Sequence, residues 1–222
     1  MAKRIGVILS GCGVYDGSEI HEAVITLLAI DRASAEAVCM APDIPQMHVI
    51  NHLTGEPESG ATRNVLIESA RIARGKIQDL AKVQASDLDA LILPGGFGAA
   101  KNLCNFAVAG ADCEVNAETA RLIKEMYAAK KPIAAVCIAP AVLSKVLGDE
   151  NISHKLTIGN DEGTAEALAA LGSEHIQCPV EEFVIDRDNK LVSSPAYMLA
   201  GRISEAAEGI EKTVQALIGM ID

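Results

Sequence analysis

Short apolar runs alternate with helix-like segments along nearly all of this chain, and that alternation limits the folds open to it. The runs at residues 5–9, 88–93 and 133–136 are predominantly apolar and show no period of two, which is typical of strands covered on both faces. Strands of this kind that are separated by helices build a mostly parallel sheet with helices on both sides. We therefore predict an α/β fold with a doubly wound, mostly parallel sheet.

The remaining elements follow from the same patterns. Further strands are predicted at 37–41 and 154–158, and a hairpin at 183–186 and 190–193. Helices are predicted at 19–33, with Ser18 as the cap, and at 63–73, 116–129, 139–147, 164–171 and 203–221. The chain has 222 residues, half of them apolar, which is enough for one large core and predicts a single domain over 1–222.

The junction at Cys137 is the strongest chemical signal. The apolar run at 133–136 stops at this cysteine, and a helix-like segment begins at once. In an open α/β sheet such a side chain stands at the carboxyl end of a strand and over the amino end of a helix, where nucleophiles are presented. Because the helix dipole and free N–H groups favour an anion, we expect a lowered thiol pKa. A small buried core cysteine is the alternative.

Two further groups belong to the same rim of the predicted sheet. Gly95 and Gly96 follow the run at 88–93, and with the amide of Ile138 they are candidates for an oxyanion hole; a plain glycine turn is the alternative. Glu22 lies one turn into the first predicted helix and is a candidate to exchange a proton with the thiol. The alternative is an ordinary solvated glutamate on the helix surface. His21 is its neighbour but points about 100° away around the helix.

Composition narrows the class of protein. The formal net charge of −11 argues against nucleic acid or anionic membrane as a partner, and no stretch has the apolar length of a membrane span. The six cysteines form no C-x-x-C pair and no zinc spacing, so we expect no metal and reduced thiols. With no secretory pattern before the first strand, we expect a cytoplasmic protein. Cys12, in a rim loop, is a weaker candidate for a second reactive thiol.

Several motifs together resemble the ElbB family, described as isoprenoid-biosynthesis proteins with an amidotransferase-like domain, within the PfpI and class I glutamine amidotransferase-like superfamily. The resemblance covers essentially the whole chain. The motifs are SGCGVYDGSEIHE at 10–22, NHLTG at 51–55, TRNVLI at 62–67, PGGFGAAKNL at 94–103, CIAP at 137–140 and SPAYML at 194–199.

The resemblance implies a flavodoxin-like three-layer sandwich with a nucleophile elbow. It also implies a cofactor-independent glyoxalase-type lyase that converts glyoxal, or another small aldehyde or dicarbonyl, to a hydroxy acid. Cys137 would be the nucleophile and Glu22 its acid/base partner, with Gly95 and Gly96 serving the oxyanion. Relatives are described as deglycases or stress proteins and are often dimers, so we expect a homodimer.

The sequence departs from its superfamily in its histidines. In many relatives a histidine follows the strand that comes after the elbow helix. In this sequence no histidine stands there, and His154 falls at the beginning of the strand. The His-x-Glu pair of glutamine amidotransferases is also missing, so ammonia release from glutamine is not expected. We predict a Cys–Glu dyad, with a histidine from a distant loop, such as His21 or His52, as a candidate helper. The alternative function is a cysteine-based redox sensor or an accessory binding protein with little turnover.

Substrate choice is harder to assign from the sequence. We expect the residues that set it in the segment 43–75, which carries no chemical pattern. Arg63 in that segment is a candidate partner for a carboxylate, with a surface salt bridge as the favoured alternative.

Overall fold

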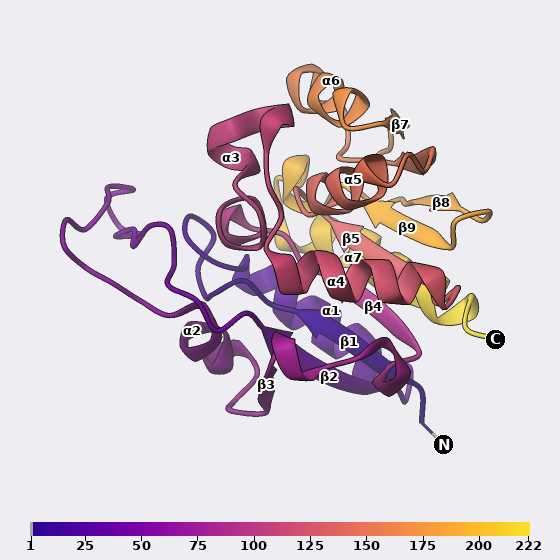
Figure 1. Cartoon of the computed structure of the whole chain (residues 1–222), viewed down its shortest axis with the longest axis horizontal. Helices are drawn as coiled ribbons and strands as arrows, with labels where there is room; N and C mark the ends of the chain where they lie inside the picture. The colour runs from indigo at the N-terminus through magenta and orange to yellow at the C-terminus, as the bar shows by residue number, and fades with distance from the viewer. Residues whose placement is uncertain (1) are drawn as a thin grey trace.

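A seven-stranded sheet forms the centre of the protein, which we describe from a computed structural model over residues 2–222 (Figure 1). The strand order is β3-β2-β1-β4-β5-β9-β8, and all neighbours are parallel except β8 and β9. The strands are β1 Arg4–Ile8, β2 Glu36–Ala41, β3 Ile77–Asp79, β4 Ala90–Leu93, β5 Ile133–Val136, β8 Val184–Asp186 and β9 Leu191–Ser194. The predicted mostly parallel α/β sheet is confirmed.

Helices cover both faces of this sheet, so the protein has three layers. In Figure 1, α4 and α5 lie in front of the sheet, while α1 and α7 pack together behind it. The helices are α1 Ile20–Arg32, α2 Val65–Ile72, α3 Phe106–Ala109, α4 Ala117–Ala128, α5 Pro140–Asp149, α6 Glu162–Ala170 and α7 Ile203–Gly219. Among the described residues, no helix is both long and apolar enough to cross a bilayer.

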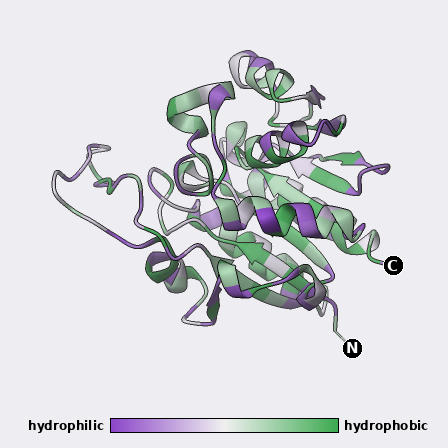
Figure 2. Cartoon of the chain, viewed as in Figure 1, coloured by the Kyte–Doolittle hydropathy of each residue, from purple (hydrophilic) through white to green (hydrophobic). Residues whose placement is uncertain are grey.

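Successive strand residues send their side chains into opposite core layers. Leu91 of β4 and Ala135 of β5 pack in the layer beneath α4 and α5. Their neighbours Ile92 and Ala134 pack in the layer against α1 and α7. Because each layer takes every second residue, a buried strand is apolar throughout. Figure 2 shows this pattern as green strands between helices that carry purple residues.

The structure differs from the sequence predictions at several elements. The cap of α1 is Glu19, whose carboxylate accepts from the Glu22 amide at 2.7 Å, rather than Ser18. The predicted strand at 154–158 forms as β6 His154–Leu156, but it pairs with β7 Ser173–His175 in a separate two-stranded sheet. The predicted hairpin is confirmed as β8 and β9. β3, β7 and α3 were not predicted.

The order of the strands fixes where a ligand site can form. The chain runs from β1 outward through β2 to β3, and then crosses back to β4 on the other side of β1. Ligands of open α/β sheets bind outside the carboxyl ends of the strands at such a reversal. The segments that follow β1, β4, β5 and β9 therefore meet at one rim.

Candidate active site

Cys137 occupies the sharp turn between β5 and α5. Its φ is +60°, a left-handed conformation that costs a non-glycine residue on the order of 1–3 kcal/mol. The turn is held by the Cys137 amide, which donates to the Ser194 carbonyl of β9 at 3.0 Å, and by the Ala139 amide, which donates to the Val136 carbonyl at 3.0 Å. Pro140 then starts α5 at a position where a missing N–H is harmless. A strained, well-held turn of this kind matches the predicted nucleophile elbow.

Glu22 lies fully buried beside this cysteine. One carboxyl oxygen, Oε2, accepts from the Gly95 amide at 2.9 Å, and the other, Oε1, accepts from the Tyr197 amide at 3.1 Å. The carboxyl also faces the Cys137 thiol, since Glu22 Oε2 and the sulfur lie 2.6 and 2.9 Å from the point where a Cβ on Gly95 would stand, and the thiol lowers the pKa of Glu22. Glu22 is therefore fixed by backbone groups that follow β4 and β9, and the solvated alternative is wrong.

Burial dominates the titration of this carboxyl. Loss of water raises the pKa of Glu22 to about 7. Hydrogen bonds from the Tyr197 and Gly95 amides lower the pKa, whereas the nearby Glu19 carboxylate raises it. A carboxyl with a pKa near neutrality can both hold and release a proton at physiological pH, which suits a general acid and base.

The Cys137 thiol does not follow the expectation of a lowered pKa. Burial raises its pKa well above the ordinary value, and the charge of an ionised Glu22 raises it further. The amides of Gly96 and Ile138 donate to the sulfur and lower the pKa, but they do not outweigh burial. Because protonating Glu22 removes that charge and leaves a donor facing the sulfur, a thiolate is favoured only while Glu22 holds the proton.

Gly95 and Gly96 are required by the closeness of the chains around them. A Cβ on Gly95 would lie 2.6 Å from Glu22 Oε2 and closer still to the Cys137 Cβ. Gly96 has φ +92°, and a Cβ there would lie 2.5 Å from the Gly17 carbonyl oxygen. The three amides predicted for the oxyanion hole have different partners. The Gly95 amide donates to Glu22, whereas the amides of Gly96 and Ile138 lie near the sulfur and lower its pKa.

A pocket of about 380 Å³ opens at Cys137. Its wall includes Val14, Phe97, Phe106, Ile138, Tyr197 and Met198. Cys137 is only 7% exposed, so this pocket is its route to a ligand. Among the described residues, none from 43–75 lines the pocket, so the expectation that this segment sets substrate choice is wrong for this cavity.

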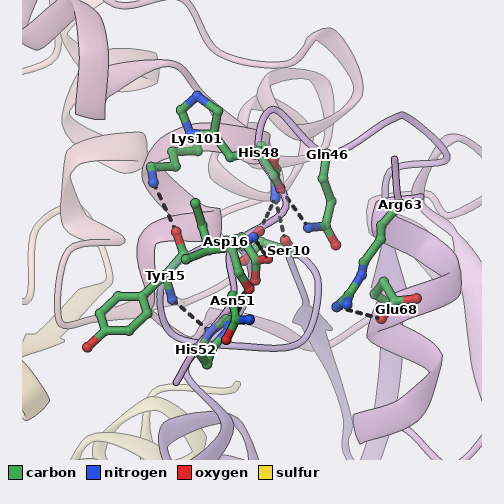
Figure 3. A network of polar contacts seen from close by, with 12 residues as sticks. Ser10, Tyr15, Asp16, Gln46, His48, Asn51, His52, Arg63, Glu68 and Lys101 are labelled. Atoms are coloured by element: carbon green, nitrogen blue, oxygen red, sulfur yellow. Dashed lines mark hydrogen bonds and ion pairs between the residues drawn. The ribbon is translucent and has the colours of Figure 1, made fainter. Parts of the chain in front are cut away.

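A polar network holds the loop at residues 9–19, which joins β1 to α1 (Figure 3). Buried Asp16 accepts from the Ile50 amide at 2.8 Å, and the Asn102 side chain donates to the carbonyls of Ser10 and Asp16 at 2.8 and 2.9 Å. The Lys101 ammonium donates to the Tyr15 carbonyl at 2.9 Å. These contacts fix the loop whose Gly17 packs against Gly96, so they position the Gly96 amide indirectly.

Comparison with known proteins shows the family to which this chain belongs. A family model described as the DJ-1/PfpI family matches residues 14–194. The chain belongs to the DJ-1/PfpI family.

Two relatives of this DJ-1/PfpI protein agree with the ElbB resemblance. It is 49% identical to glutamine amidotransferase-like class 1 domain-containing protein 3, mitochondrial, of Homo sapiens, over 98% of this chain and 83% of that protein. A solved isoprenoid biosynthesis protein with an amidotransferase-like domain from Ehrlichia chaffeensis is 38% identical over all of both chains, with a TM-score of 0.93. Drosophila melanogaster DJ-1beta, at 19% identity over 99% of this chain and 96% of that one and a TM-score of 0.56, shares the fold.

Among the described residues, no histidine lines the pocket of this DJ-1/PfpI protein. His21 is exposed and its Nδ1 lies 2.9 Å from the Tyr197 hydroxyl, so it meets the pocket wall only through that tyrosine. His52 lies in the segment between β2 and α2, and its Nε2 accepts from the amide of Tyr15 in the loop between β1 and α1 at 3.2 Å. His154 is buried at the start of β6, with its Nδ1 2.8 Å from the Ile152 carbonyl.

Two weaker candidates from the sequence, Cys12 and Arg63, have no contact with the pocket at Cys137 in their favour. Burial and the Glu68 carboxylate raise the pKa of Cys12, which does not line the pocket. The Arg63 guanidinium lies 3.7 Å from the Glu68 carboxylate, so it forms the salt bridge that was the favoured alternative to a ligand contact. Over the described residues, no group of three or more histidine, cysteine, aspartate or glutamate side chains has a geometry that could hold a metal ion.

Sequence reasoning missed two residues of the site. Tyr197 supplies the second amide to Glu22 and part of the pocket wall. Its place directly after a strand, inside the SPAYML motif, was the signal available. Asn102 supports the loop between β1 and α1 from the π-helical turn Ala99–Leu103, and its place inside the PGGFGAAKNL motif was the signal available.

Proposed function

We propose that this protein is a cofactor-independent glyoxalase-type lyase that converts glyoxal to glycolate, with Cys137 as nucleophile and Glu22 as acid and base. The observation that carries the proposal is a buried carboxyl with a pKa of about 7 packed against a cysteine that sits at a strained elbow and lines a ligand pocket. A nucleophile within reach of a proton carrier is the arrangement that covalent catalysis needs.

The first step forms a bond between sulfur and carbon. The thiol gives its proton to Glu22, and the thiolate adds to one aldehyde carbon of glyoxal. The carbonyl oxygen becomes an alkoxide, and we assign its stabilisation to the amides of Gly96 and Ile138, which lower the pKa of the neighbouring sulfur. Protonation of this oxygen by Glu22 gives a neutral hemithioacetal and leaves Glu22 as a carboxylate.

The second step moves a proton between the two carbons. The Glu22 carboxylate removes the hydrogen from the carbon that bears sulfur, which gives an enediolate. The hydroxyl proton on that carbon passes to the neighbouring oxygen, Glu22 returns its proton to the other carbon, and the product is a thioester of glycolate on Cys137. Water attacks the thioester carbonyl, the carbon–sulfur bond breaks, and glycolate and the free thiol are released. The sum is glyoxal plus one water to glycolic acid, so no external oxidant or reductant is used.

Glyoxal turnover by three variants tests the proposal. Cys137→Ala should lower kcat/KM at least about a thousandfold, and Glu22→Gln by about 10²–10⁴-fold. Cys12→Ala is the matched control, because this cysteine lies outside the pocket wall and its loss should leave turnover near the wild-type rate. Equal rates in wild type, Cys137→Ala and Glu22→Gln would contradict the proposal. Selective peroxide oxidation of Cys137 without any turnover would instead favour a redox sensor.

The proposal extends to assembly and location. We propose a homodimer in the cytoplasm, from the habits of the superfamily and the pattern of reduced cysteines. The human relative and the rat ES1 protein homolog carry the word mitochondrial in their names. Light scattering on the purified protein and fractionation of cells that express it test both points.

A further inference from the structure

Two buried cysteines flank the segment that carries α3. Cys104 and Cys113 are 4% and 1% exposed, and both are free thiols. Cys104 pairs with Val115 in an antiparallel bridge, and Cys113 lies two residues before Val115 in extended backbone. Because residues two apart in an extended segment point to the same face, the two thiols lie on one side of this bridge as diagonal neighbours.

Hydrogen bonds close the base of this segment. The Asn105 amide donates to the Glu114 carbonyl at 3.1 Å, and the Asn116 amide donates to the Leu103 carbonyl at 2.8 Å. The Asn105 side chain also accepts from the Glu114 amide at 2.7 Å. The two chains at the base are therefore held in one register, which keeps the thiols together.

The segment between the two cysteines packs loosely. It lies beside α6 (Figure 1), and none of the residues 105–112 is buried, although Phe106 and Ala107 line the pocket at Cys137. Segments with few buried contacts open locally at a low cost in free energy. A small oxidant can therefore reach the thiols beneath the segment.

The surroundings make the two thiols chemically unequal. The pKa of the Cys113 thiol is lowered, first by Cys104 and also by the Lys145 ammonium of α5, although burial opposes this effect. The pKa of the Cys104 thiol is raised by Cys113 and by burial, and this thiol donates to the Ala99 carbonyl at 3.4 Å. Cys113 is therefore the attacking sulfur and Cys104 the resolving thiol, as in redox-sensing pairs.

We propose that Cys104 and Cys113 form a reversible disulfide when the protein meets hydrogen peroxide, and that this bond ties the two ends of the segment 105–112 together. The proposal does not depend on the proposed function. Disulfides of cytosolic proteins are commonly transient and redox-sensing, which suits a pair that is reduced in the resting protein.

The oxidation has two steps. The Cys113 thiol ionises and its sulfur attacks one peroxide oxygen; an S–O bond forms, the O–O bond breaks, and the leaving hydroxide takes up the released proton as water. The Cys104 sulfur then attacks the resulting sulfenic acid; an S–S bond forms, the S–O bond breaks, and the hydroxide leaves with the Cys104 proton as water. Two thiols and one hydrogen peroxide give one disulfide and two waters, and a dithiol reductant reverses the change.

Tryptic mapping tests the proposal directly, because residues 102–121 form one tryptic peptide that holds both cysteines and no other. The protein is treated with hydrogen peroxide, its remaining thiols are blocked with N-ethylmaleimide, and the peptides are weighed with and without dithiothreitol. We expect an unblocked peptide 102–121 that is two hydrogens lighter and regains them with dithiothreitol. In Cys104→Ala, Cys113 should instead remain a sulfenic acid that dimedone traps, and in Cys113→Ala, Cys104 should stay reduced.

Cys39→Ala is the matched control, because it removes another buried thiol that lies outside this segment, and the disulfide should still form in it. Amide hydrogen exchange gives a second readout. Exchange in residues 105–112 should slow at least about tenfold in the oxidised wild type and stay unchanged in peroxide-treated Cys104→Ala.

Three results overturn the inference. One is a peptide 102–121 with two blocked thiols at a peroxide dose that oxidises Cys137. Another is a Cys113 that proceeds to sulfinic acid, or joins a cysteine outside the peptide, without pairing with Cys104. The third is hydrogen exchange in the segment that does not differ between the disulfide and dithiol forms.

Discussion

Glu22 and Cys137 lie against each other inside the protein, with Glu22 Oε2 and the Cys137 sulfur 2.6 and 2.9 Å from the point where a Cβ on Gly95 would stand, although one residue comes from α1 and the other from the turn after β5. Neither group is accessible enough to be stabilised by bulk water, since Glu22 is 0% and Cys137 7% exposed. An ionised Glu22 therefore raises the pKa of the Cys137 thiol, and protonation of Glu22 removes that charge. The predictions below follow from that pairing and from the backbone that holds it.

The stability of the protein should depend on pH through Glu22. Its folded pKa of about 7 lies above the ordinary 4.5, so its protonated form stabilises the fold below pH 4.5, and this contribution is lost as pH rises through about 7. Glu22→Gln removes the acceptor of either the Gly95 or the Tyr197 amide at every pH, so we expect its free energy of unfolding relative to wild type to rise between pH 5 and pH 8, by up to about 3 kcal/mol. Urea unfolding at both pH values measures this difference. The same difference at pH 5 and pH 8 would contradict the buried-acid account.

Glu19 should tune the acid that acts on the thiol. Its carboxylate raises the pKa of Glu22, and its Oε2 also caps α1. Glu19→Gln removes the charge and keeps an acceptor for the cap, so the limb of the kcat/KM profile that titrates near pH 7 should move to lower pH. Glu19→Ala should move it similarly and in addition lower stability by about 1 kcal/mol through loss of the cap. A limb that stays in place in Glu19→Gln would show that this limb does not report Glu22.

Gly95 should not tolerate a side chain. A Cβ there would lie 2.6 Å from Glu22 Oε2 and closer to the Cys137 Cβ, so Gly95→Ala must push the two groups apart. We expect kcat/KM to fall about a hundredfold or more, because misplacing reacting groups by about 1 Å has that effect. Gly219→Ala is the control, since a Cβ at the end of α7 meets nothing within 4 Å and should leave turnover unchanged. Wild-type turnover in Gly95→Ala would mean that the contact is not needed.

The sequence predicted those parts of the protein that rest on local pattern. The run Ile133–Val136 and the helix behind Cys137 identify the elbow, because strand, turn and helix are neighbours in the chain. The short edge strand Ile77–Asp79 carries no apolar run, and the partner of His154–Leu156 is a choice between distant segments, so neither pairing was predictable. Edge strands and long-range pairings depend on tertiary contacts more than on local propensity.

The site was only partly predictable for the same reason. Cys137, Glu22 and the glycine pair were identified, but their division of labour depends on which amide points where. The amides of Gly95 and Tyr197 both donate to the Glu22 carboxyl, the second from the segment that follows β9. These two hydrogen bonds can be seen only in the folded backbone. The prediction of a lowered Cys137 pKa was wrong because it considered only the helix dipole. Burial and the buried Glu22 carboxylate oppose that effect and raise the pKa.

The most direct test is the pH dependence of Cys137 alkylation by an uncharged reagent, in wild type and in Glu22→Gln. An ionised Glu22 raises the pKa of this thiol, so its replacement by a neutral amide that can donate to the sulfur should lower the thiol pKa. Cys12→Ala in both backgrounds removes the partly exposed thiol that would otherwise obscure the measurement. The account predicts a lower alkylation midpoint in Glu22→Gln than in wild type. An unchanged or higher midpoint would contradict it, because Cys137 and Glu22 would then not share a proton.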